Sequence, residues 1–149
     1  MSPEERNTFV SLLCNLLVNG YVIWRLREMF AAGAFNGPDA LQVWAQMTLW
    51  VIGAAIVLTI LLTIAFNIVF AIATGDHDPS FLKDERDAVF EMRGNGATTL
   101  LMVLGFIGSI VALAVGSSAL TAFLILYFLT AAGSLMGDIV KLLSYRAGG

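Results

Sequence analysis

The chain has 149 residues, of which 58% are hydrophobic and 13% carry a charge, with a formal net charge of −3. This composition and a mean hydropathy of +0.84 exclude an ordinary soluble domain and predict a protein surrounded mostly by lipid. Four segments are apolar enough to cross a bilayer, which takes about 20 helical residues. Because the period-two alternation of barrel strands is absent, we expect an all-α integral membrane protein with one membrane domain, 1–149.

The first predicted span covers about residues 8–30 and follows an acidic start, whereas a cleaved signal peptide begins with basic residues. Ser2 and Glu5 fit a helix capping box, and Pro3 suits the first helical position. We therefore expect this helix to begin at Pro3 and to be retained in the protein.

The second predicted span covers about residues 43–73 and is joined to the first through AAGAFNGPDA. Gly33 is the expected helix stop and Pro38 the expected start, so the helices should end near Ala32 and run from Pro38 to Thr74. At 1.5 Å per residue they are about 45 and 55 Å long and should project beyond the bilayer.

Residues 75–96 form a charged connection before the third span. Pro79 and Ser80 indicate a helix start, and the glycines at 94 and 96 a stop, so we expect a short amphipathic helix over Phe81–Arg93. Its charged residues are the predicted contacts for a soluble protein partner: Asp84, Glu85, Arg86, Asp87 and Glu91. A solvated charged surface is one alternative. The other is a divalent-cation site that uses Asp76, His77 and Asp78 with this acidic face.

The third and fourth predicted spans cover about residues 97–116 and 119–137. Only Gly116-Ser117-Ser118 separates them, which allows a tight antiparallel hairpin, so the fold should consist of two antiparallel hairpins. Small residues at helical spacing allow the helix backbones to approach closely. These residues are Gly105, Ser109, Gly133 and Gly137. They can serve contacts within the chain or in a homodimer, and the sequence leaves both open.

Weakly polar residues recur at helical spacing in three of the spans and should face protein instead of lipid. The expected pairs between the first two spans are Ser11 with Asn67, Asn15 with Thr63, and Asn19 with Thr59. A second stripe follows the last span through Tyr127, Thr130, Ser134 and Asp138. Either these residues form interhelical hydrogen bonds or they line a ligand cavity. The cavity candidates are Asn15, Asn19, Thr59, Thr63, Asn67, Tyr127 and Ser134.

Basic residues divide six against two between the two sides of the four spans. One side has Arg6, Lys83, Arg86, Arg93, Lys141 and Arg146, and the other has Arg25 and Arg27. Because cytoplasmic segments are enriched in Lys and Arg, we expect a multi-pass protein of the bacterial inner membrane with both termini in the cytoplasm. Trp24, Trp44 and Trp50 should then lie near the opposite interface.

Missing residue types argue against several activities. The single histidine, His77, lies in a predicted loop, so a transmembrane haem site with two His ligands is not expected. No ionisable residue lies near the middle of a predicted span, which argues against proton-coupled transport. Cys14 should be a packed, inert thiol. We expect no catalytic residue, cofactor or bound metal, and no direct contact with nucleic acid.

The run Asp84-Glu85-Arg86-Asp87, followed by Glu91 and placed just before a span, resembles an element of small multi-pass bacterial and archaeal membrane proteins of unknown function. Some of these are encoded beside a short helix-turn-helix regulator, which implies a membrane partner that restrains or releases a DNA-binding protein. We therefore expect a non-enzymatic regulatory or sensor protein. The alternatives are an accessory or assembly subunit of a larger membrane complex, and a protein that binds or transports a small lipophilic ligand.

Overall fold

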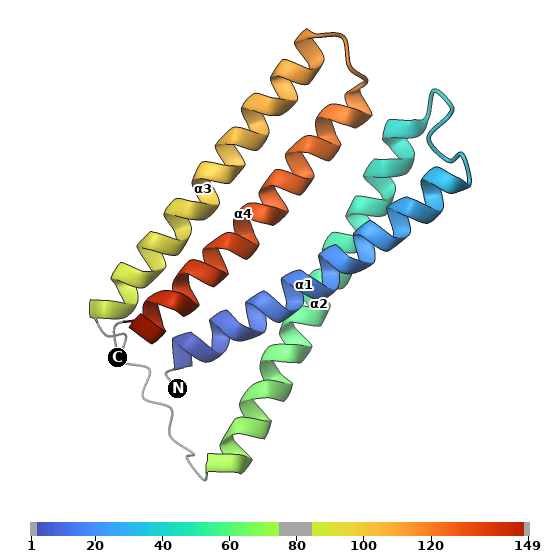
Figure 1. The fold of residues 1–149 in the computed structure, drawn as a ribbon. Coiled ribbons are helices and arrows are strands. Elements are labelled where there is room, and N and C mark those ends of the chain that lie inside the picture. The colour runs from blue at the N-terminus through green and yellow to red at the C-terminus, as the bar shows by residue number, and fades with distance from the viewer. Residues whose placement is uncertain (1–2, 75–84, 148–149) are drawn as a thin grey trace.

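The computed structural model describes residues 3–74 and 85–147, and this part of the chain forms long α-helices joined by short turns (Figure 1). The described helices are α1 (Pro3–Ala31), α2 (Ala40–Thr74), α3 (Glu85–Ala114) and α4 (Ala119–Ala147). All of them are long and apolar enough to cross a membrane. The prediction of an all-α, multi-pass membrane protein is confirmed at this level. The capping residue Ser2 and residues 75–84 lie outside the described part.

Glycine ends two of the helices. Gly33 and Gly116 have φ angles of +70° and +83°, a region that residues with a Cβ rarely adopt. After α1, the amide of Ala34 donates a hydrogen bond to the carbonyl of Met29 at 3.0 Å, and Gly116 allows the same arrangement after α3. Such bonds satisfy carbonyls left open at a helix C-terminus. The predicted helix stop at Gly33 is therefore confirmed.

The helices differ in how much they contact one another. α3 and α4 lie side by side along most of their length, whereas α1 contacts both α4 and α2 (Figure 1). α2 meets α4 near its own start, where the rings of Trp44 and Tyr127 pack edge-on with centroids 5.3 Å apart. Both chain ends lie at one end of the molecule, and the turns at 32–39 and 115–118 lie at the other (Figure 1).

Glycines allow the close contact between α3 and α4. Gly94 and Gly105 of α3 and Gly133 and Gly137 of α4 are all buried. A Cβ at Gly133 would lie 2.9 Å from the carbonyl oxygen of Thr98, and a Cβ at Gly137 would overlap the Thr98 hydroxyl. That hydroxyl donates a hydrogen bond to the Gly133 carbonyl at 3.1 Å. The missing side chains therefore let the two backbones and this hydroxyl meet directly.

α3 runs without interruption through Gly94-Asn95-Gly96, where the sequence predicted the end of a separate amphipathic helix. The predicted break is wrong because Gly94 serves packing: a Cβ there would lie 2.7 Å from the carbonyl oxygen of Gly137. The residues from Glu85 to Arg93 are thus the first turns of the same helix. Ser109, the remaining predicted packing residue, is also buried.

A buried apolar cluster lies where α1, α2 and α4 meet near the turn at 32–39. It consists of Val22, Leu26, Trp44 and Val51. Most other apolar residues of α2 are exposed, including Trp50 at 81% and Ile72 at 78% of their surface. An apolar outer surface of this kind suits contact with lipid tails. These tails are as apolar as the side chains of a neighbouring helix, so the surface needs no protein partner.

Candidate functional site

A line of polar side chains joins α1 to α4 and centres on Asp138. The Asp138 side chain is 7% exposed, and its Oδ2 accepts hydrogen bonds from Ser11 Oγ at 2.9 Å and Asn15 Nδ2 at 2.8 Å. Asn15 Nδ2 also donates to Ser134 Oγ at 3.0 Å. Hydrogen bonds to a charged group are stronger than neutral ones, and low polarity strengthens them further. We call this set the α1–α4 seam: Ser11, Asn15, Asn19, Tyr127, Ser134 and Asp138.

The seam continues along both helices and borders a cavity. The Tyr127 hydroxyl donates to Asn19 Oδ1 at 3.2 Å, and Asn19 Nδ2 donates to the Asn15 carbonyl at 2.8 Å. A cavity of about 440 Å³ lies beside these residues. Its polar lining is Asn15, Asn19, Thr48, Tyr127, Thr130 and Ser134. The structure thus brings together, at one cavity, the predicted cavity residues that belong to α1 and α4.

The cavity residues predicted on α2 lie elsewhere. Thr59 donates its hydroxyl to the Ala55 carbonyl at 2.8 Å, and Asn67 Nδ2 donates to the Thr63 carbonyl at 2.9 Å. None of the three predicted α2 residues lines this cavity. Because Thr59 and Asn67 bond to carbonyls of their own helix, they need no partner on α1. The predicted pairing between the first two spans is therefore wrong, since the α1 stripe bonds to α4.

A different row of α1 side chains contacts α2. Cys14 is buried, as a packed thiol would be, and its Sγ lies 3.0 Å from Thr59 Oγ1. Nearer the start of α1, the guanidinium of Arg6 lies 4.2 Å from the ring centroid of Phe70. Arg6 is 8% exposed, and its Nε has no hydrogen-bond partner among the described residues. A cation held over an aromatic face gains electrostatic stabilisation from the ring.

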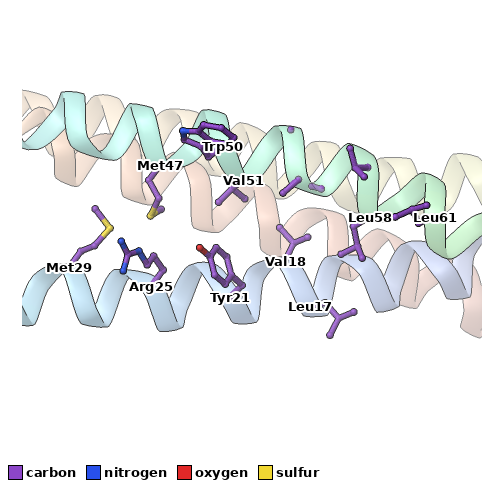
Figure 2. Close-up of a pocket in the computed structure, with 14 residues that line it drawn as sticks. Leu17, Val18, Tyr21, Arg25, Met29, Met47, Trp50, Val51, Leu58 and Leu61 are labelled. Atoms are coloured by element: carbon purple, nitrogen blue, oxygen red, sulfur yellow. The ribbon is translucent and has the colours of Figure 1, made fainter.

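A groove of about 960 Å³ lies between α1 and α2 (Figure 2). The larger side chains that line it are Leu17, Val18, Tyr21, Arg25 and Met29 of α1, and Met47, Trp50, Val51, Leu58 and Leu61 of α2. Gly53, Ala54 and Ala55 complete much of the α2 side, so small residues leave room where helix side chains would otherwise interdigitate. The groove has the size of a binding site for a small molecule.

α1 supplies a hydroxyl and a guanidinium to the groove. The Tyr21 hydroxyl and the Arg25 guanidinium both point toward the space between the helices (Figure 2). Arg25 Nη1 forms an ion pair with Glu28 Oε2 at 3.1 Å, and both side chains are 46% exposed. A guanidinium carries five N–H donors, so this pair leaves donors available for another acceptor. The groove therefore combines a long apolar lining with a cationic group.

Of the charged residues predicted to bind a partner, those that the structure describes lie at the start of α3, where the helix contacts α4. Asp87 is half-buried, and its carboxylate is a hydrogen-bond partner of the Tyr145 side chain. The rings of Phe90 and Tyr145 pack edge-on with centroids 5.1 Å apart. Arg86 and Glu91 are exposed. Asp84 lies outside the described residues, as do the candidate cation ligands Asp76, His77 and Asp78.

The sequence predicted neither the burial of Asp138 nor the groove between α1 and α2. The predicted last span ended at residue 137, whereas the candidate span of α4 continues to Ala147 and contains Asp138. The prediction that no ionisable residue lies near the middle of a span stays a prediction. The spacing of Thr130, Ser134 and Asp138 was the available signal. Nothing comparable marked the groove, because its lining consists of residues that any lipid-facing helix carries.

Comparison with known proteins gives no relative: no family model, curated protein or solved structure matches the chain. The geometry of the groove and the seam is therefore the basis for inferring function.

Proposed function

We propose that this protein is a non-enzymatic membrane regulator that binds an amphiphilic molecule in the α1–α2 groove and signals to a soluble partner through the charged start of α3. The groove is the observation that carries this proposal. Its volume of about 960 Å³ falls in the range of small-molecule sites, roughly 300 to 1,000 Å³. Such a site on a chain with long lipid-exposed helices is reached most directly by a molecule already dissolved in the bilayer.

The chemistry of the lining favours an amphiphile with an anionic head. Leu58 and Leu61 lie toward one end of the groove, and Met29 and Met47 toward the other, near Arg25 (Figure 2). Methionine side chains adapt to ligands of varied shape. The guanidinium matches a carboxylate or phosphate, because its N–H groups can donate to two oxygens at once. An acyl chain along the groove with its head at Arg25 satisfies both parts of the lining.

Photolabelling tests the groove. The purified protein in lipid nanodiscs is irradiated with an anionic fatty acid that carries a diazirine on its chain, and the labelled peptides are identified by mass spectrometry. We expect labelling on residues 17–29 and 47–61. Ala54→Trp places a large ring in the groove and should lower labelling about tenfold, equivalent to about 1.4 kcal/mol. Ile60→Trp is the matched control, because Ile60 is exposed on α2 but does not line the groove.

Substitution of Arg25 tests the head group. Arg25→Gln should weaken labelling by the fatty acid and leave labelling by a neutral monoacylglycerol of equal chain length unchanged. Labelling that is the same in Ala54→Trp as in the parent protein, or spread evenly over α3, would mean that the groove holds ordinary solvating lipid and would remove the basis of this proposal.

The output side of the proposal rests on charge at the start of α3. Arg86 and Glu91 are exposed there, and the Asp-Glu-Arg-Asp run resembles that of membrane proteins encoded beside small DNA-binding regulators. Exchange of these two residues, Arg86→Glu with Glu91→Arg, keeps composition and net charge. We expect it to abolish copurification of a cytoplasmic partner from native membranes and to leave membrane insertion intact. Exchange of Arg27 and Asp39 at the opposite end, both exposed, is the control, and equal recovery from both variants contradicts the assignment.

A cytoplasmic location for that end is part of the same proposal, supported by the six basic residues assigned to it. In a Cys14→Ser background, a single cysteine at Asn36 should react with a membrane-impermeant maleimide in intact cells, and one at Arg93 only after lysis. Reaction of the Asn36 position only after lysis reverses the orientation and places the proposed partner surface outside.

A second candidate is an accessory subunit of a larger complex, favoured by the outer face of α2. Trp50 and Ile72 are among the most exposed large apolar residues, and α2 contains a hydrophobic stretch of 18 residues in which none is buried. Copurification in a mild detergent separates the two candidates. A stoichiometric membrane complex whose recovery is lost with Ile72→Arg and kept with Met102→Arg on α3 favours the subunit.

A further inference from the structure

Asp138 is a buried carboxyl group on α4, a helix that is long and apolar enough to cross a membrane. The helix runs from Ala119 to Ala147, so Gly133 marks its midpoint, and Asp138 lies about 8 Å from it at 1.5 Å per residue. A hydrocarbon core of about 30 Å centred on α4 extends about 15 Å on each side of that point. A layer centred on this point includes Asp138, and also Lys141 at about 12 Å from it, and an ionisable side chain at such a depth is costly and is a candidate functional residue.

The groups that contact Asp138 are neutral. Its Oδ2 accepts from the hydroxyl of Ser11 and the amide of Asn15, and within the described residues Asp138 forms no ion pair. A carboxylate loses the stabilisation by water when it is buried. Hydrogen bonds from neutral donors replace part of that stabilisation, and no opposite charge compensates for the rest. Binding a proton removes this charge and weakens the hydrogen bonds that Oδ2 accepts from α1.

Several charged side chains on the helices around Asp138 have other neighbours. Glu4 and Glu5 lie at the start of α1, and Glu4 is close enough to Tyr145 of α4 to interact with it electrostatically. Arg6 of α1 lies over the ring of Phe70 on α2, and α2 itself has no charged residue between 40 and 74. On α4, Lys141 lies with its aliphatic stem over Gly94 of α3. On α3, Glu91 and Arg93 are exposed. The side chain of Tyr145 on α4 is hydrogen-bonded to Asp87.

We propose that Asp138 is a proton-binding site and that its protonation loosens α1 from α4. In the ionised state, Oδ2 holds Ser11 and Asn15 by two charge-assisted hydrogen bonds, which join α1 to α4. The protonated carboxyl group keeps its shape but accepts these bonds more weakly. The cavity of about 440 Å³ is lined by Ser134 and by Asn15, which donates a hydrogen bond to Asp138. This polar space supplies the path for the proton. The site needs no ligand in the α1–α2 groove, so this proposal stands apart from the proposed function.

Infrared spectroscopy of the protein in lipid vesicles tests proton binding. Acidification should produce a band of protonated carboxylic acid in the parent protein that is missing from Asp138→Asn. The exposed carboxylates contribute equally to both proteins and cancel in the difference. Asp39→Asn, in the exposed turn between α1 and α2, is the control and should keep the band. A spectrum of Asp138→Asn identical to that of the parent protein at every pH would overturn the assignment.

A distance measurement tests the consequence for the helices. Spin labels at Leu16 of α1 and Met136 of α4, both exposed, report the separation across the seam. We expect the distance to increase on acidification in the parent protein and in Asp138→Glu, which keeps a titratable group, and to be constant in Asp138→Asn. The Glu variant keeps the test decisive if the Asn variant does not fold. A distance that changes equally in Asp138→Asn, or that depends on Na⁺ at constant pH, contradicts the proposal.

Discussion

The α3–α4 pair and the α1–α2 pair are both helix–turn–helix units with glycine at the turn, yet they pack in opposite ways. Gly94, Gly133 and Gly137 put the backbones of α3 and α4 in direct contact. Gly53 and Ala54 of α2 instead line an open groove, and a Cβ at Gly53 would meet no atom within 4 Å. Small residues therefore permit either a close contact or an empty space, and only the partner helix decides which.

This difference separates a rigid unit from an adaptable one. α3 and α4 have little freedom to move because glycines bring their backbones into close contact. α1 is held to α4 by the polar seam, and an apolar cluster near the turn joins α1 to both α2 and α4, with the groove beside α1. A ligand or a proton can therefore act on the position of α1 at small cost, while the α3–α4 pair remains as the fixed frame.

The largest effect should come from adding one methyl group to the α3–α4 contact. Gly137→Ala places a Cβ against the Thr98 hydroxyl and 2.9 Å from the Gly94 carbonyl oxygen. We expect a loss of about 1 to 3 kcal/mol of unfolding free energy, measured by detergent titration. Gly20→Ala is the control, because open space surrounds Gly20 on α1, and it should leave stability unchanged or raise it by up to about 1 kcal/mol. Equal effects of the two changes would mean that the α3–α4 contact is not close.

Removal of the seam should have a smaller effect. Asn15→Leu takes away one hydrogen bond to Asp138 and one to Ser134, so we expect a loss of about 1 to 2 kcal/mol in the same titration. Thr63→Val on α2 is the matched change of a residue that was predicted to pair with Asn15, and it should cost less than about 0.5 kcal/mol. A greater loss from the Thr63 variant would restore the pairing between the first two spans.

The smallest effect is expected at the α1–α2 contact. Cys14→Ala removes the interaction between Sγ and Thr59 Oγ1 and should cost about 0.5 kcal/mol, because that hydroxyl keeps its bond to the Ala55 carbonyl. Cys14→Ser preserves a polar contact and should match the parent protein. A loss above that of Asn15→Leu would show that α2 is held as firmly as α4, and the comparison between the two pairs would fail.

The sequence was sufficient to predict the long apolar helices and the turns at 32–39 and 115–118, because hydropathy and glycine act over short stretches of chain. It was not sufficient to predict which face of a helix meets which neighbour. Asn15 and Cys14 are adjacent in sequence, but about 100° apart around α1, and they face α4 and α2 respectively. Likewise, Gly94 fits a helix stop when its surroundings are unknown and a close helix contact once Gly137 lies beside it.

Val18 lines both the α1–α2 groove and the cavity beside the seam. One aliphatic side chain thus separates a hydrophobic compartment open to lipid from a polar compartment that adjoins a titratable group. Shortening it to Ala would enlarge both spaces at the place where they approach each other. In the proposed arrangement, Val18 lies between the bound amphiphile and the proton-binding site.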